Sequence, residues 1–200
     1  MRRRCFKASK VPNGVYIQSV DGKLYTVANW SQSSSNANAV AVVTDNCRFI
    51  IAKTNYTTST HWSETPSIVS NVLVSTSATT AKTDYKGKSN TDYILAAFGS
   101  NAPSAYYCSI FTFPNGQHGF LPALGELYAA YQNSTAINTA LAKIGGDSLG
   151  SDVNWSSTQY NNEIAWYLRW SSGAVDGYYK YQKATGYNGL STRVFGELNT

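Results

Sequence analysis

The sequence predicts an α+β fold with mixed or antiparallel sheets, and the order of its segments carries this prediction. Strand patterns fill residues 11–53, two helical patterns lie between residues 119 and 146, and strand patterns return in residues 155–195. We therefore expect a single domain over residues 11–200, with two main helices and a long loop-rich C-terminal region.

Alternation and turn residues predict the first strands. In segment 11–30, Val15 and Ile17 alternate with polar neighbours, and the dipeptide Asp21-Gly22 is typical of a hairpin turn. Residues 39–43 and 48–52 are apolar runs on either side of a polar turn. Continuous runs of this kind indicate strands that are buried on both faces.

The middle of the chain gives weaker signals. Residues 54–92 are rich in Ser and Thr and are compatible with a short helix or with strands between loops. Five residues are expected to anchor this part, namely Trp62, Ile68, Val72, Leu73 and Val74. A helix is predicted over residues 93–98, capped by Thr91 or Asp92 and ended by Gly99. The apolar run 105–113 is predicted to be a buried strand.

Two longer helices are predicted next. The first has Pro122 in its first turn, where a missing amide costs nothing, and it repeats apolar residues at helical spacing. These residues are Leu124, Leu127, Tyr128 and Tyr131. The second helix is predicted to be capped by Ser134 or Thr135 and to stop at Gly145-Gly146. Because strands open and close the ordered chain, we expect the first and last strands to pair and the termini to lie close together.

Charge is low and concentrated at one end. Charged residues make up 14% of the chain, against ~25% in an average protein. The net charge of +5 is supplied by the tail, in which residues 1–10 contain Arg2, Arg3, Arg4, Lys7 and Lys10. We predict that this tail is a basic disordered arm and that the near-neutral body has no nucleic-acid partner.

Membrane and cysteine signals are weak. No apolar run approaches the ~18 residues of a membrane span, so no membrane insertion is expected. The first residues lack the apolar core of a secretory signal. Cys5, Cys47 and Cys108 are too few and too widely spaced for a disulfide framework or a zinc site. Buried thiols are the main expectation, and a bridge between Cys47 and Cys108 stays open.

The C-terminal segment 155–195 has the composition of a recognition surface. It holds six of the fifteen Tyr and three of the five Trp, mixed with Ser, Gly and Asn. Aromatic side chains offer large contact area for few frozen torsions, and this mixture is common in recognition loops. Aromatic residues also favour strands, so part of the segment is expected to be framework. The expected framework residues are Trp155, Trp166, Leu168, Trp170, Val175 and Val194.

Four motifs then carry a resemblance: GFLPALGELYAAY at 119–131, NWSSTQYN at 154–161, AWYLRWSSG at 165–173 and STRVF at 191–195. Together they resemble the variable proteins of diversity-generating retroelements, found in gut bacteria and their phages. The first motif is also similar to a helix of the formylglycine-generating-enzyme fold. The resemblance implies a C-type-lectin-like fold with a variable ligand-binding region at 155–195.

In that family, adenine mutagenesis varies surface positions while a framework stays fixed. By resemblance, the varied and ligand-facing positions here lie between the fixed-looking blocks, although the Glu163 codon fits such mutagenesis less well. The candidate ligand-binding residues are Tyr160, Asn161, Asn162, Ile164, Tyr167, Arg169, Ala174, Asp176, Tyr178, Tyr179, Tyr181, Tyr187 and Asn188.

Catalytic and metal-binding patterns are not found. His61 and His118 have no Cys or carboxylate at ligand spacing, and the apolar surroundings of Cys108 favour an inert thiol. The formylglycine-generating enzymes use a cysteine pair near the C-terminal half, and no Cys follows Cys108. Calcium-dependent lectins have a carboxylate after Trp-Asn, whereas this chain has Asn154-Trp155-Ser156. We expect no enzyme activity, no cofactor and calcium-independent binding.

The sequence thus favours a ligand-binding or receptor-binding protein that displays a Tyr-rich surface on a rigid scaffold. The expected location is a phage tail in a virion, with a bacterial cell surface as the alternative, and the expected partner is a protein or glycan receptor on a bacterial surface. Two other functions stay open, a structural virion subunit and a degenerate formylglycine-generating-enzyme-like catalyst. A homo-oligomer also stays open, because the sequence reveals no stoichiometry.

Overall fold

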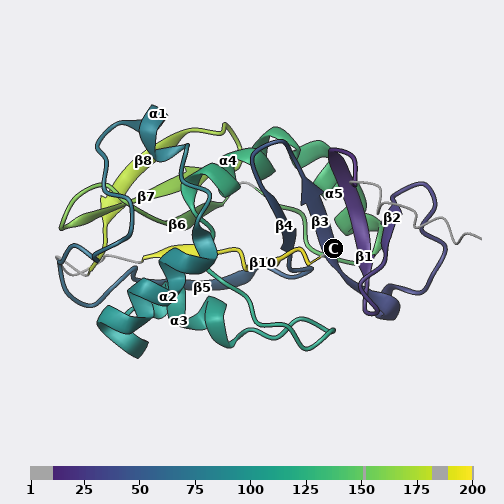
Figure 1. The fold of residues 1–200 in the computed structure, drawn as a ribbon, viewed down its shortest axis with the longest axis horizontal. Coiled ribbons are helices and arrows are strands. Elements are labelled where there is room, and N and C mark those ends of the chain that lie inside the picture. The colour runs from purple at the N-terminus through teal and green to yellow at the C-terminus, as the bar shows by residue number, and fades with distance from the viewer. Residues whose placement is uncertain (1–10, 151, 182–188, 200) are drawn as a thin grey trace, which may run out of the picture.

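The structure is a computed structural model that describes residues 11–150, 152–181 and 189–199, with residues 56–59 described by their backbone. The predicted arm 1–10 lies outside the described residues. Two five-stranded sheets lie side by side along the long axis of the molecule, with helices packed against them (Figure 1). This is an α+β architecture with antiparallel and mixed sheets, as predicted.

The first sheet has the strand order β10-β4-β3-β1-β2. Its strands are β1 (Gly14–Ser19), β2 (Leu24–Thr26), β3 (Ala37–Val43), β4 (Arg48–Ile51) and β10 (Phe195–Glu197). The hairpin β1–β2 and the hairpin β3–β4 are confirmed. Every residue of β3 is buried, and its side chains enter two different apolar clusters, which confirms burial on both faces.

The predicted pairing of the first and last strands is wrong. β1 pairs with β2 and β3, whereas β10 pairs with β4 through Phe195 opposite Ile51. The doubly buried strands β3 and β4 occupy the centre of the sheet, so the last strand adds beside β4 and is separated from β1.

The second sheet has the order β5-β9-β6-β7-β8. Its strands are β5 (Tyr56–Thr60), β6 (Val153–Gln159), β7 (Ile164–Arg169), β8 (Val175–Tyr179) and β9 (Leu190–Thr192). The sheet is mixed because β9 runs parallel to β6, with Asn154 opposite Ser191. The predicted variable region, residues 155–195, therefore supplies β7, β8, β9 and most of β6, four of the five strands of this sheet.

Five α-helices are described, rather than two main ones: α1 (Ala78–Ala81), α2 (Gly87–Phe98), α3 (Pro103–Ile110), α4 (Leu124–Gln132) and α5 (Ser134–Lys143). The two predicted helices correspond to α4 and α5, and α5 ends before Gly145, whose φ is 67°. Pro122 precedes α4 by two residues, and Asn133 rather than Ser134 or Thr135 is the residue before α5.

Residues 105–113 are not the predicted buried strand. They belong to α3 and the extended segment after it. Pro103 occupies the first turn, and Ala105 and Cys108 are buried while Tyr106 and Ile110 are exposed. Buried residues three positions apart lie on one face of a helix. The apolar run alone does not distinguish such a helix from a buried strand.

The helix predicted from residue 93 begins at Gly87 instead. Thr91 therefore lies inside the helix rather than at its cap, and its hydroxyl bonds the segment before α4. The Thr91 hydroxyl donates to the Gly87 carbonyl and accepts from the Leu121 amide. Among the expected anchors of this region, Trp62 and Val72 are buried, whereas Ile68 is 53% exposed and Val74 39% exposed, so these two anchor predictions are wrong.

The two described cysteines do not form a bridge. Cys47 and Cys108 are free thiols, and they lie in different apolar clusters. Burial raises the pKa of Cys47 to about 11 and that of Cys108 to about 12, so both thiols are protonated at neutral pH.

Candidate ligand-binding surface

The strands β7 and β8 bring four of the predicted site residues together. In their antiparallel register, Tyr167 lies opposite Asp176 and Ala165 lies opposite Tyr178. Because side chains alternate along a strand, Tyr167 and Arg169 share one face of the sheet with Asp176 and Tyr178. Arg169, Asp176 and Tyr178 are exposed on this face, and Tyr167 is half-buried.

A fixed tryptophan supports this face from the neighbouring strand. Trp155 of β6 is fully buried and lies opposite Tyr167. Its ring centroid is 6.0 Å from that of Tyr178, and the Tyr167 and Tyr178 rings meet edge to face at 6.3 Å. Such aromatic pairs stabilise by ~0.5–1.5 kcal/mol beyond area burial. The exposed Tyr178 ring therefore rests on a rigid aromatic base.

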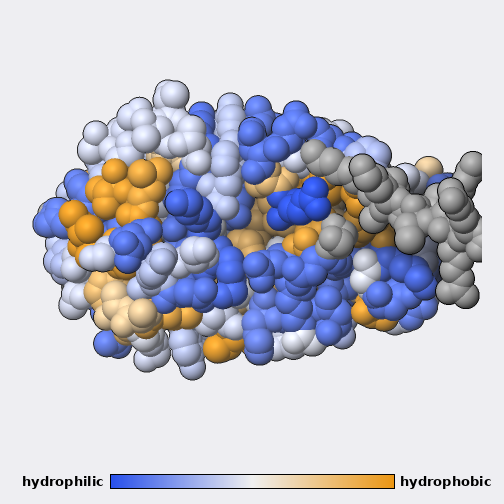
Figure 2. Space-filling model, viewed as in Figure 1, coloured by the Kyte–Doolittle hydropathy of each residue, from blue (hydrophilic) through white to orange (hydrophobic). Residues whose placement is uncertain are grey.

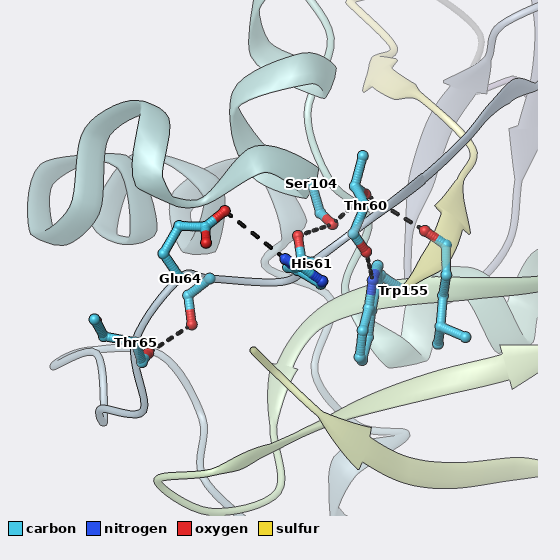
Figure 3. Close-up of polar contacts among 8 residues, drawn as sticks. Thr60, His61, Glu64, Thr65, Ser104 and Trp155 are labelled. Carbon is cyan, nitrogen blue, oxygen red and sulfur yellow. Dashed lines mark hydrogen bonds and ion pairs between the residues drawn. The ribbon is translucent and has the colours of Figure 1, made fainter. Parts of the chain in front are cut away.

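Hydrogen bonds hold that base in place (Figure 3). The Trp155 indole N–H donates to the Thr60 carbonyl at 2.7 Å, and the hydroxyls of Thr60 and Ser104 lie 2.7 Å apart. Ser104 also donates to the His61 carbonyl. The end of β5, the start of α3 and the centre of β6 are thus joined under the aromatic face.

The same contacts argue against a serine–histidine catalytic pair. The Ser104 hydroxyl bonds the backbone carbonyl of His61, while the imidazole Nδ1 lies 3.8 Å from a Glu64 carboxylate oxygen on the outer side (Figure 3). In a nucleophilic pair the imidazole would face the hydroxyl. Within residues 11–150, 152–181 and 189–199, no group of three His, Cys, Asp or Glu residues could hold a metal ion.

The opposite face of β7 and β8 carries three other predicted site residues. Tyr160, Ile164 and Tyr179 are half-buried there, and the Tyr160 ring centroid lies 5.0 Å from that of Trp166. This face packs on the apolar core that includes Trp166 and Leu168. Tyr160 is therefore partly framework, a role that the sequence pattern did not reveal.

The remaining predicted residues lie in turns. The Asn161 side-chain oxygen accepts from the amides of Glu163 and Ile164, so it supports the turn before β7. Asn162 and Ala174 are exposed, and Tyr181 is half-buried just after β8. Tyr187 and Asn188 lie outside the described residues.

The framework prediction is largely confirmed. Trp155, Trp166, Leu168, Trp170 and Val194 are buried, and Val175 is half-buried. β7 shows the expected alternation, since Trp166 and Leu168 point into the core and Arg169 is exposed.

Sequence reasoning missed Lys180, which directly follows the Tyr-rich strand. Its side chain is fully buried, and its Nζ donates at 2.8 Å to the Gln159 side-chain oxygen and at 2.8 Å to the Ser67 carbonyl. The Nζ also lies 4.5 Å from the centre of the Trp62 ring. Burial lowers the pKa of Lys180 to about 7. The only sequence signal is its place two residues after Tyr178 on the same strand face.

Lys180 ties the end of β8 to the long loop before α1. Its amide donates to the Glu163 carbonyl, and its carbonyl accepts from the Ser63 amide. Together with the bond to Ser67, these contacts fix the backbone directly after Tyr178 and Tyr179. The exposed aromatic face is therefore preordered, which lowers the entropy lost on binding.

No helix in the described parts of the chain has the length and apolar character of a membrane span. No family model matches the sequence, and none of the curated proteins searched matches it. Among solved structures, the chain is similar to a fimbrial protein from Bacteroides ovatus, with 17% identity and a TM-score of 0.52. The likeness covers 92% of this chain and 48% of that one, so this chain spans about half the length of the fimbrial protein. At this identity the likeness concerns the fold.

Proposed function

We propose that this chain is a non-enzymatic receptor-binding module of a cell-surface adhesin. A fold shared with part of a fimbrial protein supports a surface location, because fimbriae are surface appendages. The likeness favours a bacterial cell surface over the phage tail. The partner in this proposal is a protein or glycan receptor on another cell.

One observation carries the proposal most directly. Tyr167, Arg169 and Tyr178 lie on one face of β7 and β8, and the Tyr178 ring packs near the hydrogen-bonded, buried Trp155. Tyr, Trp and Arg dominate the binding energy of known interfaces, and rigid aromatic side chains lose little entropy on binding. The arrangement is that of a preordered recognition surface.

The finer part of the proposal is a diversified C-type-lectin-like scaffold. Within this proposal, the exposed residues of β7 and β8 vary between gene copies while Trp155, Trp166 and Leu168 stay fixed, because only the latter are buried in the core. Sequencing of sibling gene copies and the flanking DNA tests it. Differences at adenines, concentrated at codons 167, 169, 176 and 178 and repeated in a template beside a reverse transcriptase, support it. Changes spread evenly over buried and exposed codons contradict it.

The binding face has a direct test in Tyr178→Ala. A fluorescently labelled full-length chain is titrated onto a panel of bacterial strains, and the strains that retain it are tested again with the variant. We expect Tyr178→Ala to weaken retention about tenfold or more, as is usual for an aromatic hot spot.

Tyr93→Ala is the matched control, because Tyr93 is 42% exposed on α2 and Tyr178 is 36% exposed on β8. Equal losses from both variants would contradict a specific face, and retention by no strain would contradict the receptor-binding role. A stable oligomer in which Tyr178 is shielded from solvent would instead favour a structural subunit.

A further inference from the structure

Two neighbouring hollows lie away from the aromatic face, on the connector between α1 and α2, which runs down the side of the molecule facing the viewer (Figure 1). One has a volume of about 300 Å³ and the other about 360 Å³. Lys86 lines both, so the two hollows are neighbours. Small-molecule sites usually measure ~300–1,000 Å³, so each hollow by itself reaches the lower end of this range.

The hollow beside α2 has a cationic lining. Arg48, Lys86 and Lys88 line it, with Glu197 as a facing acid, and Lys88 is also paired with Asp92. The second acid, Glu126, is buried, and burial raises its pKa to about 8, so it is mostly protonated at neutral pH. Figure 2 shows hydrophilic and hydrophobic residues side by side on this face of the molecule. The Lys86 ammonium has no partner among the described residues.

The hollow beside the loop at Asn71 has the lining of a site for hydroxyl groups. Asn71, Thr83 and Asp84 supply an amide, a hydroxyl and a carboxylate, and Val72 and Leu73 supply an aliphatic edge. The amide of Asn71 has no hydrogen-bond partner among the described residues. Amides and carboxylates that converge beside an apolar edge fit a sugar ring, which offers hydroxyls on its rim and C–H groups on its faces.

The polar groups of this hollow are held in place before any ligand arrives. Asp84 accepts from the Lys86 amide, from Asn90 and from the Thr158 hydroxyl, which leaves lone-pair capacity on its oxygens. Asn71 is the non-glycine residue with a positive φ, 66°, among those described. Such a conformation is costly for most residues and recurs at binding sites.

We propose that the two neighbouring hollows together bind an acidic saccharide. One of its rings lies against Asn71, Asp84 and Leu73, and a carboxylate lies beside Lys86 and Arg48. The site goes beyond the receptor-binding face, since it uses none of the residues on β7 and β8. The saccharide site can therefore be tested independently of the receptor-binding proposal.

The probes that test the site are 3′-sialyllactose and trigalacturonic acid, each paired with its uncharged counterpart, lactose or the galacturonate methyl ester. Each is titrated into the ¹⁵N-labelled full chain, and the amide resonances of residues 71–89 are followed. We expect the acidic member of at least one pair to bind about tenfold more tightly than its counterpart, the usual effect of a hydrogen bond to a charged group.

Two variants separate the parts of the site. Lys86→Gln removes the shared cation and should abolish the preference for the acidic probe, whereas Lys143→Gln, on the exposed side of α5, should not. Asn71→Gly keeps the positive φ, removes the amide, and should weaken the acidic and neutral probes alike.

Three results would overturn the proposal. The first is that neither acidic probe moves these resonances, and the second is that Lys86→Gln binds as the unaltered chain does. The third is that inorganic phosphate at the same concentration produces the same shifts as the acidic saccharides, because this would show an anion site without sugar recognition. None of these results bears on Tyr178.

Discussion

Glu126 shows at the residue scale how burial fixes a protonation state. It is 5% exposed in α4, and its Oε2 accepts from the Ala123 amide at 2.8 Å. The same oxygen stands where a side chain on Gly87 would lie, so this carboxyl packs directly on the start of α2. Desolvation raises its pKa from 4.5 to about 8, with the nearby Asp84 acting in the same direction.

The first prediction concerns Glu126→Gln. The folded pKa lies above the unfolded one, so the native chain holds a proton that the unfolded chain releases. The contribution of Glu126 to the free energy of unfolding is fully present below about pH 4.5. It falls by on the order of a few kcal/mol as the pH rises through about 8. Urea unfolding at pH 5 and pH 9 should show this loss in the unaltered chain and a smaller loss in Glu126→Gln. Equal losses would contradict it.

Lys180 gives a second prediction with the opposite sign. Its folded pKa of about 7 lies below the ordinary 10.5, so the native chain holds fewer protons than the unfolded chain between these values. The contribution of Lys180 to the free energy of unfolding is fully present above pH 10.5. It falls by on the order of 1 kcal/mol per pH unit as the pH falls toward 7.

Lys180→Met, which has similar length and no charge, should flatten this dependence. Thermal unfolding between pH 8 and pH 9.5 checks it, with Lys143→Met as a control at an exposed lysine. A slope that is the same in all three proteins would exclude Lys180 as its source.

At the element scale, the turn between β7 and β8 is fixed by its contact with α4. Gly173 has a φ of 67°, and a Cβ there would lie 2.1 Å from the Tyr131 ring. Gly116 has a φ of 85° with nothing within 4 Å of a Cβ, so the two glycines share backbone strain and differ in packing.

The third prediction follows from this pair. Gly173→Ala should destabilise the chain by about 2 kcal/mol or more, and Gly116→Ala by about 1 kcal/mol, because only the first adds a clash with a ring. Chemical denaturation of both variants measures the difference. Equal destabilisation would show that α4 does not restrain the turn.

Elements were predictable from the sequence where their residues were apolar on both faces or alternated regularly between buried and exposed. β3 and β4 were predicted because apolar residues fill both faces, and β7 because Trp166 and Leu168 alternate with Arg169. α3 was missed because Tyr106 and Ile110 are exposed aromatic and aliphatic residues, which made a one-sided helix look uniformly apolar.

At the scale of the whole molecule, the order of strands was beyond the sequence. Local alternation gives a strand and its turn, but the choice between β1 and β4 as partner of β10 depends on which edge the completed sheet leaves open. The same limit applies to the site. Strand period predicts that Tyr167 and Arg169 share a face, whereas the burial of Lys180 and the packing of Tyr160 on Trp166 depend on distant segments.

The position of β10 has a consequence for frame-shifting mutations in segment 155–195. Phe195 stacks on Phe49 at 4.6 Å and exchanges two backbone hydrogen bonds with Phe120, so the first sheet is completed by a strand that follows all the strands of the second sheet in the sequence. A premature stop codon or a frameshift within codons 155–195 deletes this strand and exposes the edge of β4. A mutation in that segment that shifts the reading frame therefore also removes β10, and the resulting chain should be degraded more readily because its first sheet is incomplete.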